Sequence, residues 1–386
     1  MRSPFNHGIA RVSFRCPLLA LVLLATMAPA EVQSLPRFAL LSGTRCSGCH
    51  VNIQGGGPRN ELGWSAMNAV GAWTYDEVGL DLLMGETNQF AEGLYAFGFD
   101  ARLQVAKLGR PPDDKRKVIP MQVAPSVTVV PIDWLTIYAE YNAGPLRYPG
   151  QTSYEAAAIV QPDFLLPSLK VGHFQPTIGL RWDDHTLFVR RDPAGTGSPI
   201  IPPNHAEFGA EISYEGNAMV SATAGIFASN NLARANGGTD STKPAFAARL
   251  MLWPQLLEEG INTNIGASVL LNDRFTLVNA FAGVGLADLA GIEGEVAMVR
   301  NGSDLRVRNI SVTAYWQLWT WLVAEGRIER GESWPAADAV STTATSYVAG
   351  LEFFPLPSIE LRPEYRYLDT REYTLAQYAV QLHVFY

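Results

Sequence analysis

The sequence predicts an all-β fold, a transmembrane antiparallel β-barrel of about 16 strands with a short N-terminal segment before it. Three observations support this fold class. Apolar and polar residues alternate from residue 90 onward, turn signals interrupt the alternation, and the chain ends on an alternating strand. A period of two with one apolar and one charged face is typical of strands that separate two media.

Residues 1–30 have the pattern of a secretory signal peptide. The apolar stretch 18–25 precedes Ala28-Pro29-Ala30, a small-residue cleavage pattern, so we expect Glu31 to begin the mature chain. The basic residues that come before the apolar stretch are Arg2, Arg11 and Arg15.

Composition and charge argue against a nucleic-acid-binding protein and against a helical membrane protein. The formal net charge is −8, and an acidic exported chain is a poor nucleic-acid binder. Beyond the signal no apolar run approaches the ~20 residues of a membrane helix, so strands would have to cross the membrane. Loss of the signal removes Cys16 and leaves Cys46 and Cys49 as the cysteines of the mature chain.

These two cysteines form a C-x-x-C-H motif, Cys46-Ser47-Gly48-Cys49-His50. Two cysteines at this spacing can bind the vinyl groups of one haem c as thioethers, and His50 is then the proximal iron ligand. A structural zinc site needs four ligands, and a redox dithiol normally lies on a thioredoxin-like βαβ fold that the sequence lacks. Export favours the haem over the dithiol.

Residues 31–88 form the predicted haem-binding segment, with a glycine turn at 55–57 and helical stretches near 60–72 and 76–84. A segment of this size is marginal on its own. We therefore expect it to plug the barrel lumen from the periplasmic side.

The distal iron ligand has two candidates, Met67 and His185, each weighed against an ordinary role in packing or in a solvated loop. His173 and His205 flank the same loop as His185.

The barrel is predicted over residues 89–386. Strands of about 10–14 residues with Tyr and Trp near their ends favour it over a soluble sandwich. In the last strand Tyr378, Val380, Leu382, Val384 and Tyr386 share one face. Such an ending resembles the C-terminal signal of outer-membrane barrels.

Turn signals give sixteen strands with both termini in the periplasm, and fourteen or eighteen strands remain open alternatives. The long loop 176–204 lies between the fifth and sixth strands, where sixteen-stranded porins carry an infolded loop. Every second residue of a strand faces the same side, and this parity predicts which residues face the lumen. The charged residues that it places there are Asp100, Arg102, Glu140, Glu207, Glu211, Arg249, Glu293, Glu295, Arg362, Glu364 and Arg366. Acidic residues such as Asp113, Asp114, Glu207 and Glu211 would concentrate a metal cation or simply be solvated.

The motif and its surroundings resemble a known family. The pattern Phe38-Ala39-x-x-Ser42-Gly43-x-x-Cys46-x-x-Cys49-His50, followed by Asn60-x-x-Gly63, resembles the fused monohaem cytochrome–porins of iron-oxidising bacteria. The close resemblance covers about residues 36–71, and the barrel matches in kind.

The resemblance implies electron transfer across the outer membrane, with Cys46, Cys49 and His50 as haem-binding residues. It implies three partners: membrane lipid, a periplasmic c-type cytochrome or other soluble electron carrier, and an extracellular metal ion or mineral. Fe(II) oxidation is the implied chemistry. Two alternatives stay open, a solute porin with a haem-bearing gate and a sheath barrel around a separate multihaem cytochrome.

Cleavage of the signal is directly testable. The intact mass of the protein extracted from membranes should match a chain beginning at Glu31, plus any covalent group. A mass that includes residues 1–30 would contradict the predicted processing.

Overall fold

The computed structural model describes residues 36–386, except for residues 68, 81–86, 109–114, 181–186, 194–198, 218, 239–242, 255–259, 303–304 and 335–339. The predicted signal peptide, His185, Asp113 and Asp114 lie outside the described residues. No helix among the described residues is both long and apolar enough to cross a membrane.

Sixteen of the described strands form one closed antiparallel barrel, because β17 pairs with β2. A further two-residue strand, β1 (Gln89–Phe90), pairs with β2 outside this ring. The barrel strands are β2 (Tyr95–Leu108), β3 (Lys115–Ile132), β4 (Leu135–Tyr141), β5 (Tyr154–Val160), β6 (Ser168–Phe174), β7 (Glu207–Asn217), β8 (Val220–Phe227), β9 (Ala245–Leu252), β10 (Ile261–Leu271), β11 (Phe275–Leu286), β12 (Ala290–Asn301), β13 (Leu305–Trp319), β14 (Leu322–Trp334), β15 (Thr342–Leu356), β16 (Ile359–Thr370) and β17 (Thr374–Phe385).

The predicted strand number and hairpin order are confirmed. Tight turns join β3 to β4 and β15 to β16, for example, and longer connections alternate with them. Short turns belong to the periplasmic side and long loops to the outside. Local alternation and turn residues suffice to fix this topology, since each strand pairs with its neighbour in sequence.

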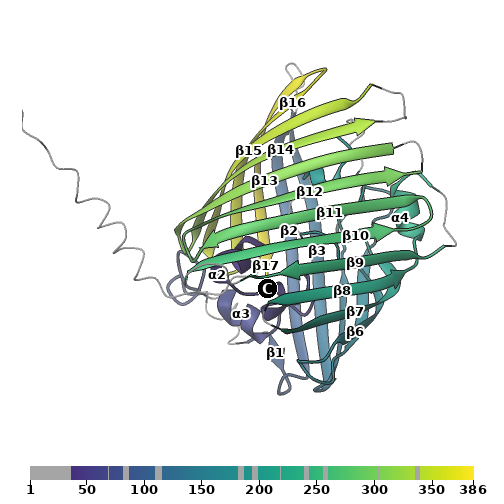
Figure 1. Ribbon diagram of the computed structural model, residues 1–386. Helices are drawn as coiled ribbons and strands as arrows, with labels where there is room; N and C mark the ends of the chain where they lie inside the picture. The colour runs from purple at the N-terminus through teal and green to yellow at the C-terminus, as the bar shows by residue number, and fades with distance from the viewer. Residues whose placement is uncertain are drawn as a thin grey trace, which may run out of the picture. The chain divides into compact units, whose positions relative to one another are not determined.

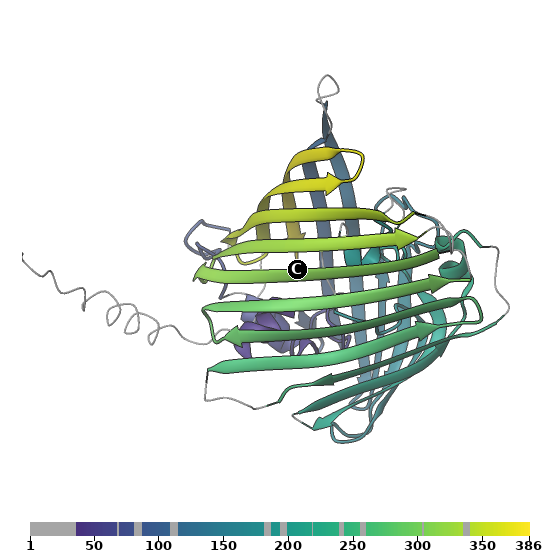
Figure 2. The same cartoon turned by 45° about the horizontal axis from the view of Figure 1, so that its top comes forward.

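In Figure 1, α2 and α3 lie at one end of the barrel and α4 at the other. The N-terminal segment carries α2 (Pro36–Ser42), η1 (Cys46–Gly48) and α3 (Glu61–Met67), so the helix expected over 60–72 is shorter than predicted. On the long-loop side, η3 (Phe188–Arg190) follows β6 and α4 (Asn230–Ala235) follows β8. Figures 1 and 2 both show α2 and α3 at the end with the short turns.

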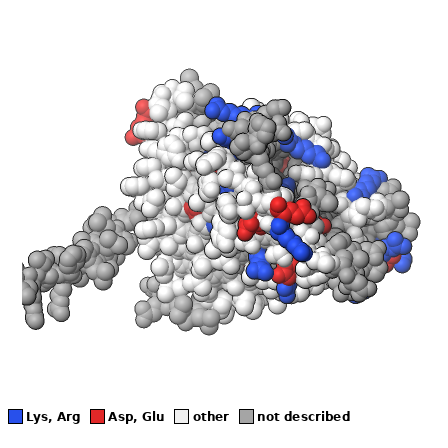
Figure 3. Space-filling model, turned by 90° about the horizontal axis from the view of Figure 1, so that it is seen from above, with Lys and Arg blue, Asp and Glu red and all other residues white. Residues whose placement is uncertain are grey.

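The two faces of the wall differ as parity predicts. All eleven charged residues predicted for the lumen are buried or half-buried. Large apolar side chains such as Val105, Val278 and Val380 are exposed on the outer face, as are the aromatic residues Trp134, Trp316, Trp319, Tyr141 and Tyr347 near strand ends. Figure 3 shows charged side chains gathered in part of one face, beside a broad area without them. An apolar belt bordered by aromatic residues is what lipid requires.

The outer belt gives a stability prediction. Val312 on β13 is 38% exposed and points outward between Arg308 and Trp316. Val312→Arg would place a charge in lipid and should destabilise the barrel by about 2–4 kcal/mol, measured as urea unfolding in lipid vesicles. Val340→Arg, at a loop residue that is 72% exposed, is the matched control and should leave stability unchanged. Equal effects of the two substitutions would argue against the assigned membrane belt.

Candidate functional site

The C-x-x-C-H motif forms a tight helical turn. The backbone N–H groups of Cys49 and His50 both donate to the carbonyl of Cys46, at 3.2 and 3.0 Å. Residues three apart in such a turn lie on the same side. Cys49 and His50 are buried, Cys46 is half-buried, and neither thiol forms a disulfide.

Asn60 holds this turn against α3. Its amide Nδ2 donates to the Gly48 carbonyl at 2.9 Å, and its Oδ1 accepts the N–H of Gly63 at 2.9 Å as a helix N-cap. The Asn60 N–H also donates to the Cys49 carbonyl at 3.1 Å. A Cβ at Gly63 would lie 2.1 Å from the Cys49 carbonyl oxygen, so only glycine allows this contact. The Asn60-x-x-Gly63 pattern therefore positions the motif.

A glycine loop follows the motif. His50 and Arg59 form an antiparallel bridge, and Val51 N–H donates to the Pro58 carbonyl at 3.0 Å. Between them Gly55, Gly56 and Gly57 all have positive φ, a conformation that favours glycine. A Cβ at Gly55 would lie 3.2 Å from Cβ of Cys46 and 3.7 Å from the His50 ring, so the bare backbone keeps space beside both residues.

Two cavities adjoin His50 and Arg59. The first, about 50 Å³, also contacts Cys46, the glycine loop and inward-facing residues of β2, β3, β4 and β17. The second, about 290 Å³, extends toward β5, β6 and β7. Ligand sites commonly span about 300–1,000 Å³, so the second cavity is just below that range and the first is much smaller.

Burial sets the chemistry of the two thiols. It raises the pKa of Cys46 to about 11, although nearby Arg249 lowers it in part, and it also raises the pKa of Cys49. Reactive cysteines have lowered pKa values and are partly exposed in positive surroundings. Both pKa shifts favour the neutral thiols.

The N-terminal segment packs against the inner wall at the short-turn end. Phe38, Trp64, Met67 and Val70 join the wall residues Tyr315, Val323, Phe354 and Phe385 in one buried cluster. The Ala72 N–H donates to the Phe354 carbonyl at 2.8 Å, and Arg45 donates to the Glu215 carbonyl at 2.8 Å. The apolar side chains of the segment are thus buried by contact with the barrel wall.

Met67 lies inside this aromatic cluster and borders neither of the two cavities beside His50. Arg59 Nη1 lies 3.3 Å from its sulfur. Its role as a distal ligand stays a prediction, and its surroundings are those of a packing residue.

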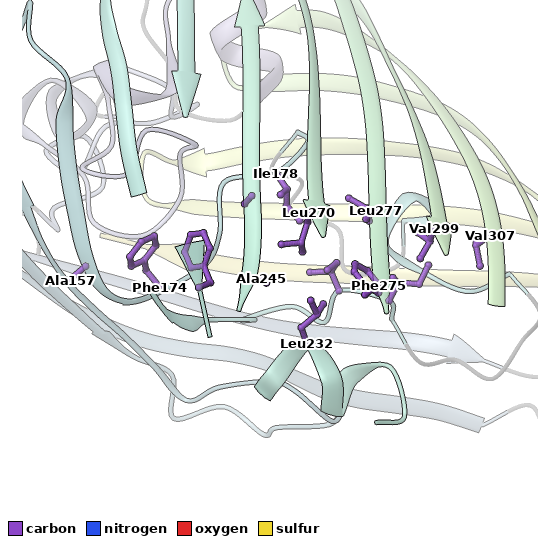
Figure 4. Packing of buried hydrophobic residues seen from close by; sticks show 14 of the residues in the cluster. Ala157, Phe174, Ile178, Leu232, Ala245, Leu270, Phe275, Leu277, Val299 and Val307 are labelled. Carbon is purple, nitrogen blue, oxygen red and sulfur yellow. The ribbon is translucent and has the colours of Figure 1, made fainter. Parts of the chain in front are cut away.

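The loop between β6 and β7 folds inward, as predicted. Ile178 packs in one cluster with the wall residues Leu270, Leu277 and Val299 (Figure 4). Ile200 and Ile201 belong to the same cluster. Buried side chains of the wall bind its backbone. Glu329 accepts the Phe188 N–H at 2.9 Å, Gly179 N–H donates to Ser268 at 2.8 Å, and Asn309 donates to the carbonyls of Phe188 and Arg191.

Two predicted cation-concentrating residues have structural partners. Glu211 accepts from the Thr177 N–H and hydroxyl at 3.1 and 2.8 Å and lies 3.4 Å from Lys170. Glu207 accepts the Leu232 N–H of α4 at 2.8 Å. Both carboxylates fasten loops, a role that sequence parity alone does not reveal.

The infolded loop also touches the N-terminal segment. Gln54 donates to the Ile178 carbonyl, and Lys170 lies 3.4 Å from Oδ1 of Asn52. Gln54, which lines the cavity of Cys46 and His50, is therefore held by the infolded loop.

His173 and His205 lie elsewhere. His173 contacts the rings of Tyr154 and Phe208 on the long-loop side, and His205 Nδ1 lies 3.3 Å from the Gly150 carbonyl. Burial lowers the pKa of His205 to about 4. Within the described ranges no group of three or more His, Cys, Asp or Glu side chains could hold a metal ion.

Sequence reasoning missed one cluster beside Cys46 and His50. His383 on β17 lines the same cavity, with Nδ1 2.9 Å from Glu360 and Nε2 3.2 Å from Asp100. Arg102 donates to both Asp100 oxygens at 3.1 and 3.0 Å. Alternation along β17 could have predicted its position, because His383 lies between Leu382 and Val384, which face outward, and must therefore face the lumen.

No protein-family model and no curated protein sequence matches the chain. Among solved structures it is similar to OprB of Pseudomonas putida, with a TM-score of 0.55 and 10% identity over 76% of this chain and 94% of that one. It is also similar to an anion-selective porin from Comamonas acidovorans, with a TM-score of 0.54 and 9% identity over 76% and 99% of the two chains. The outer membrane channel DcaP of Acinetobacter baumannii gives a TM-score of 0.51 and 10% identity over 77% and 99%. At these identities the likeness shows the fold, a porin-type outer-membrane barrel.

The closed barrel and its apolar outer belt place this protein in the bacterial outer membrane. Residue Tyr386 and the N-terminal segment lie at the end with the short turns, which is the periplasmic side.

The anchoring of the infolded loop gives a prediction. Asn309→Ala removes two hydrogen bonds to the loop, one buried and one partly buried, each worth about 0.5–1.5 kcal/mol, and should loosen it. Added protease should then cut the loop faster in intact vesicles. Ser311→Ala, a buried inward position two residues along β13, is the matched control and should leave cutting unchanged. Identical cutting of both variants and the wild type would show that Asn309 does not hold the loop.

Proposed function

We propose that this protein is an outer-membrane electron conduit, a monohaem cytochrome–porin that binds one haem c covalently through Cys46 and Cys49, with His50 as proximal ligand. One observation carries the proposal: Cys46 and His50 border one cavity beside bare glycine backbone, and Cys49 lies one helical turn from Cys46 with neither thiol in a disulfide.

The residues present fit a haem in three respects. The two thiols are one helical turn apart and form no disulfide. The glycine loop leaves room beside Cys46 and His50, where any larger residue at Gly55 would intrude. Arg59 borders the cavity, and a guanidinium group suits a carboxylate such as those that a haem carries.

When bound, the haem supplies a one-electron site. The protein controls its surroundings: the segment and infolded loop restrict water, and the wall provides charged groups that influence its potential. Because the segment lies at the short-turn end, a periplasmic c-type cytochrome or another soluble carrier can dock close to it.

A molecule that enters from outside the cell would pass through the long-loop half of the lumen. A cavity of about 280 Å³ on the long-loop side is lined by Gln104, Arg147, Tyr148, Arg191 and Arg366. Gln104 and Arg102 are consecutive inward residues of β2, so this cavity and the one beside His50 lie along one strand. An extracellular donor or acceptor, with Fe(II) the one that the sequence resemblance implies, would approach by this route.

A solute porin is the second candidate function. It is supported by the porin-type fold, by the infolded loop and by the charged inner wall. In that case the N-terminal segment acts as a gate. A sheath for a separate multihaem cytochrome is less favoured, because the two inserted segments already occupy part of the lumen.

Reconstituted vesicles distinguish these functions. The full-length protein is placed in lipid vesicles that hold an oxidised soluble c-type cytochrome, and Fe(II) is added outside. We expect the trapped cytochrome to be reduced, because the haem in the barrel connects the two compartments.

The control is the Cys46→Ala/Cys49→Ala barrel, which cannot attach haem and should fall to the rate of empty vesicles. Single-channel conductance is recorded for both proteins. Equal reduction rates together with large open channels would instead identify a solute porin.

A further inference from the structure

The iron of a haem attached at Cys46 and Cys49 has a second axial position, and the barrel wall offers a ligand for it. We propose that His383 of β17 is the distal haem ligand. This inference rests on the proposed function and identifies a residue of the wall as part of the cofactor site.

Position supports His383 over the other candidates. Among the described residues, it is the one histidine or methionine that shares the cavity of Cys46 and His50. His173 and His205 lie on the long-loop side, and Met67 belongs to a buried apolar cluster and does not line this cavity. His383 is 5% exposed and points into the lumen. Because β17 pairs with β16 on one side and β2 on the other, the position of His383 along the barrel axis is fixed.

The surroundings of His383 suit a metal ligand. Metal-binding histidines usually donate one ring N–H to a carboxylate, which fixes ring orientation and raises the basicity of the other nitrogen. Nδ1 lies 2.9 Å from Glu360 Oε2, and Glu360 is directly opposite His383 in the register of β16 and β17. The ring is therefore held by Glu360 with Nε2 turned toward Asp100.

Binding of iron would replace the contact between Nε2 of His383 and Asp100. The Nε2–Asp100 distance is the longer of the two, at 3.2 Å. Binding of Nε2 to iron would require Nε2 to release its proton to water, and Asp100 would keep both hydrogen bonds from Arg102. The exchange therefore leaves no buried carboxylate without a partner, which would otherwise be costly.

Neighbouring groups complete the site. The Arg59 guanidinium lies 4.5 Å from the centre of the Phe385 ring, and that ring lies 4.8 Å from the ring of His383. The segment and β17 are thus already in contact at this point. Ligation by His383 would join the two parts of the chain through iron, which accounts for a haem segment without a hydrophobic core of its own.

The test uses the full-length protein purified with its haem and reads the haem spectrum. In the wild type we expect low-spin haem that forms no CO adduct when reduced. His383→Ala should open one axial position, giving high-spin haem that binds CO stoichiometrically, and added imidazole should restore the low-spin spectrum. Met67→Leu is the matched control and should keep the wild-type spectrum.

Near-infrared magnetic circular dichroism of the oxidised wild type gives a second readout that needs no variant. A signature of two imidazole ligands supports His383, and an imidazole–thioether signature overturns it. A low-spin, CO-resistant His383→Ala protein would also overturn the inference while covalent haem in the wild type leaves the proposed function standing. Absence of covalent haem from the wild type would overturn both.

Discussion

Inward carboxylates and arginines on sixteen strands cannot fill the lumen that these strands enclose, because a barrel of this size leaves a wide aqueous space. Two inserted segments occupy part of it. The loop after β6 is bound by wall groups such as Glu329 and Asn309, and the N-terminal segment buries Phe38 and Trp64 against the wall. The position of the C-x-x-C-H motif depends on these contacts, because the buried apolar side chains of the segment pack on the barrel wall.

Much of the fold follows from local sequence. Alternation, turn residues and loop lengths predict sixteen strands and their order, since among the described strands every pairing except β17 with β2 joins neighbours in sequence. The motif and its pattern Asn60-x-x-Gly63 could also be found from the sequence, and the structure supplies the reason for the pattern: Asn60 caps α3 and holds the Gly48 carbonyl.

The rest could not be predicted because it depends on contacts between distant residues. His383 reaches the cavity of His50 only because closure of the barrel pairs β17 with β2 and because the segment inserts beside that seam. Likewise, parity places Glu207 and Glu211 in the lumen but does not reveal that each one fastens a loop. Charged side chains that face the lumen of this protein therefore hold loops in place as well as contacting water.

The visible spectrum of the protein purified from outer membranes, recorded after denaturation and again on the folded protein with Fe(II), tests the central claim most directly. A reduced haem band that stays with the denatured chain and is lost in the Cys46→Ala/Cys49→Ala protein is the predicted result, and its appearance with Fe(II) alone would identify iron as a donor. A folded barrel that carries no haem band would contradict the account and leave a solute porin.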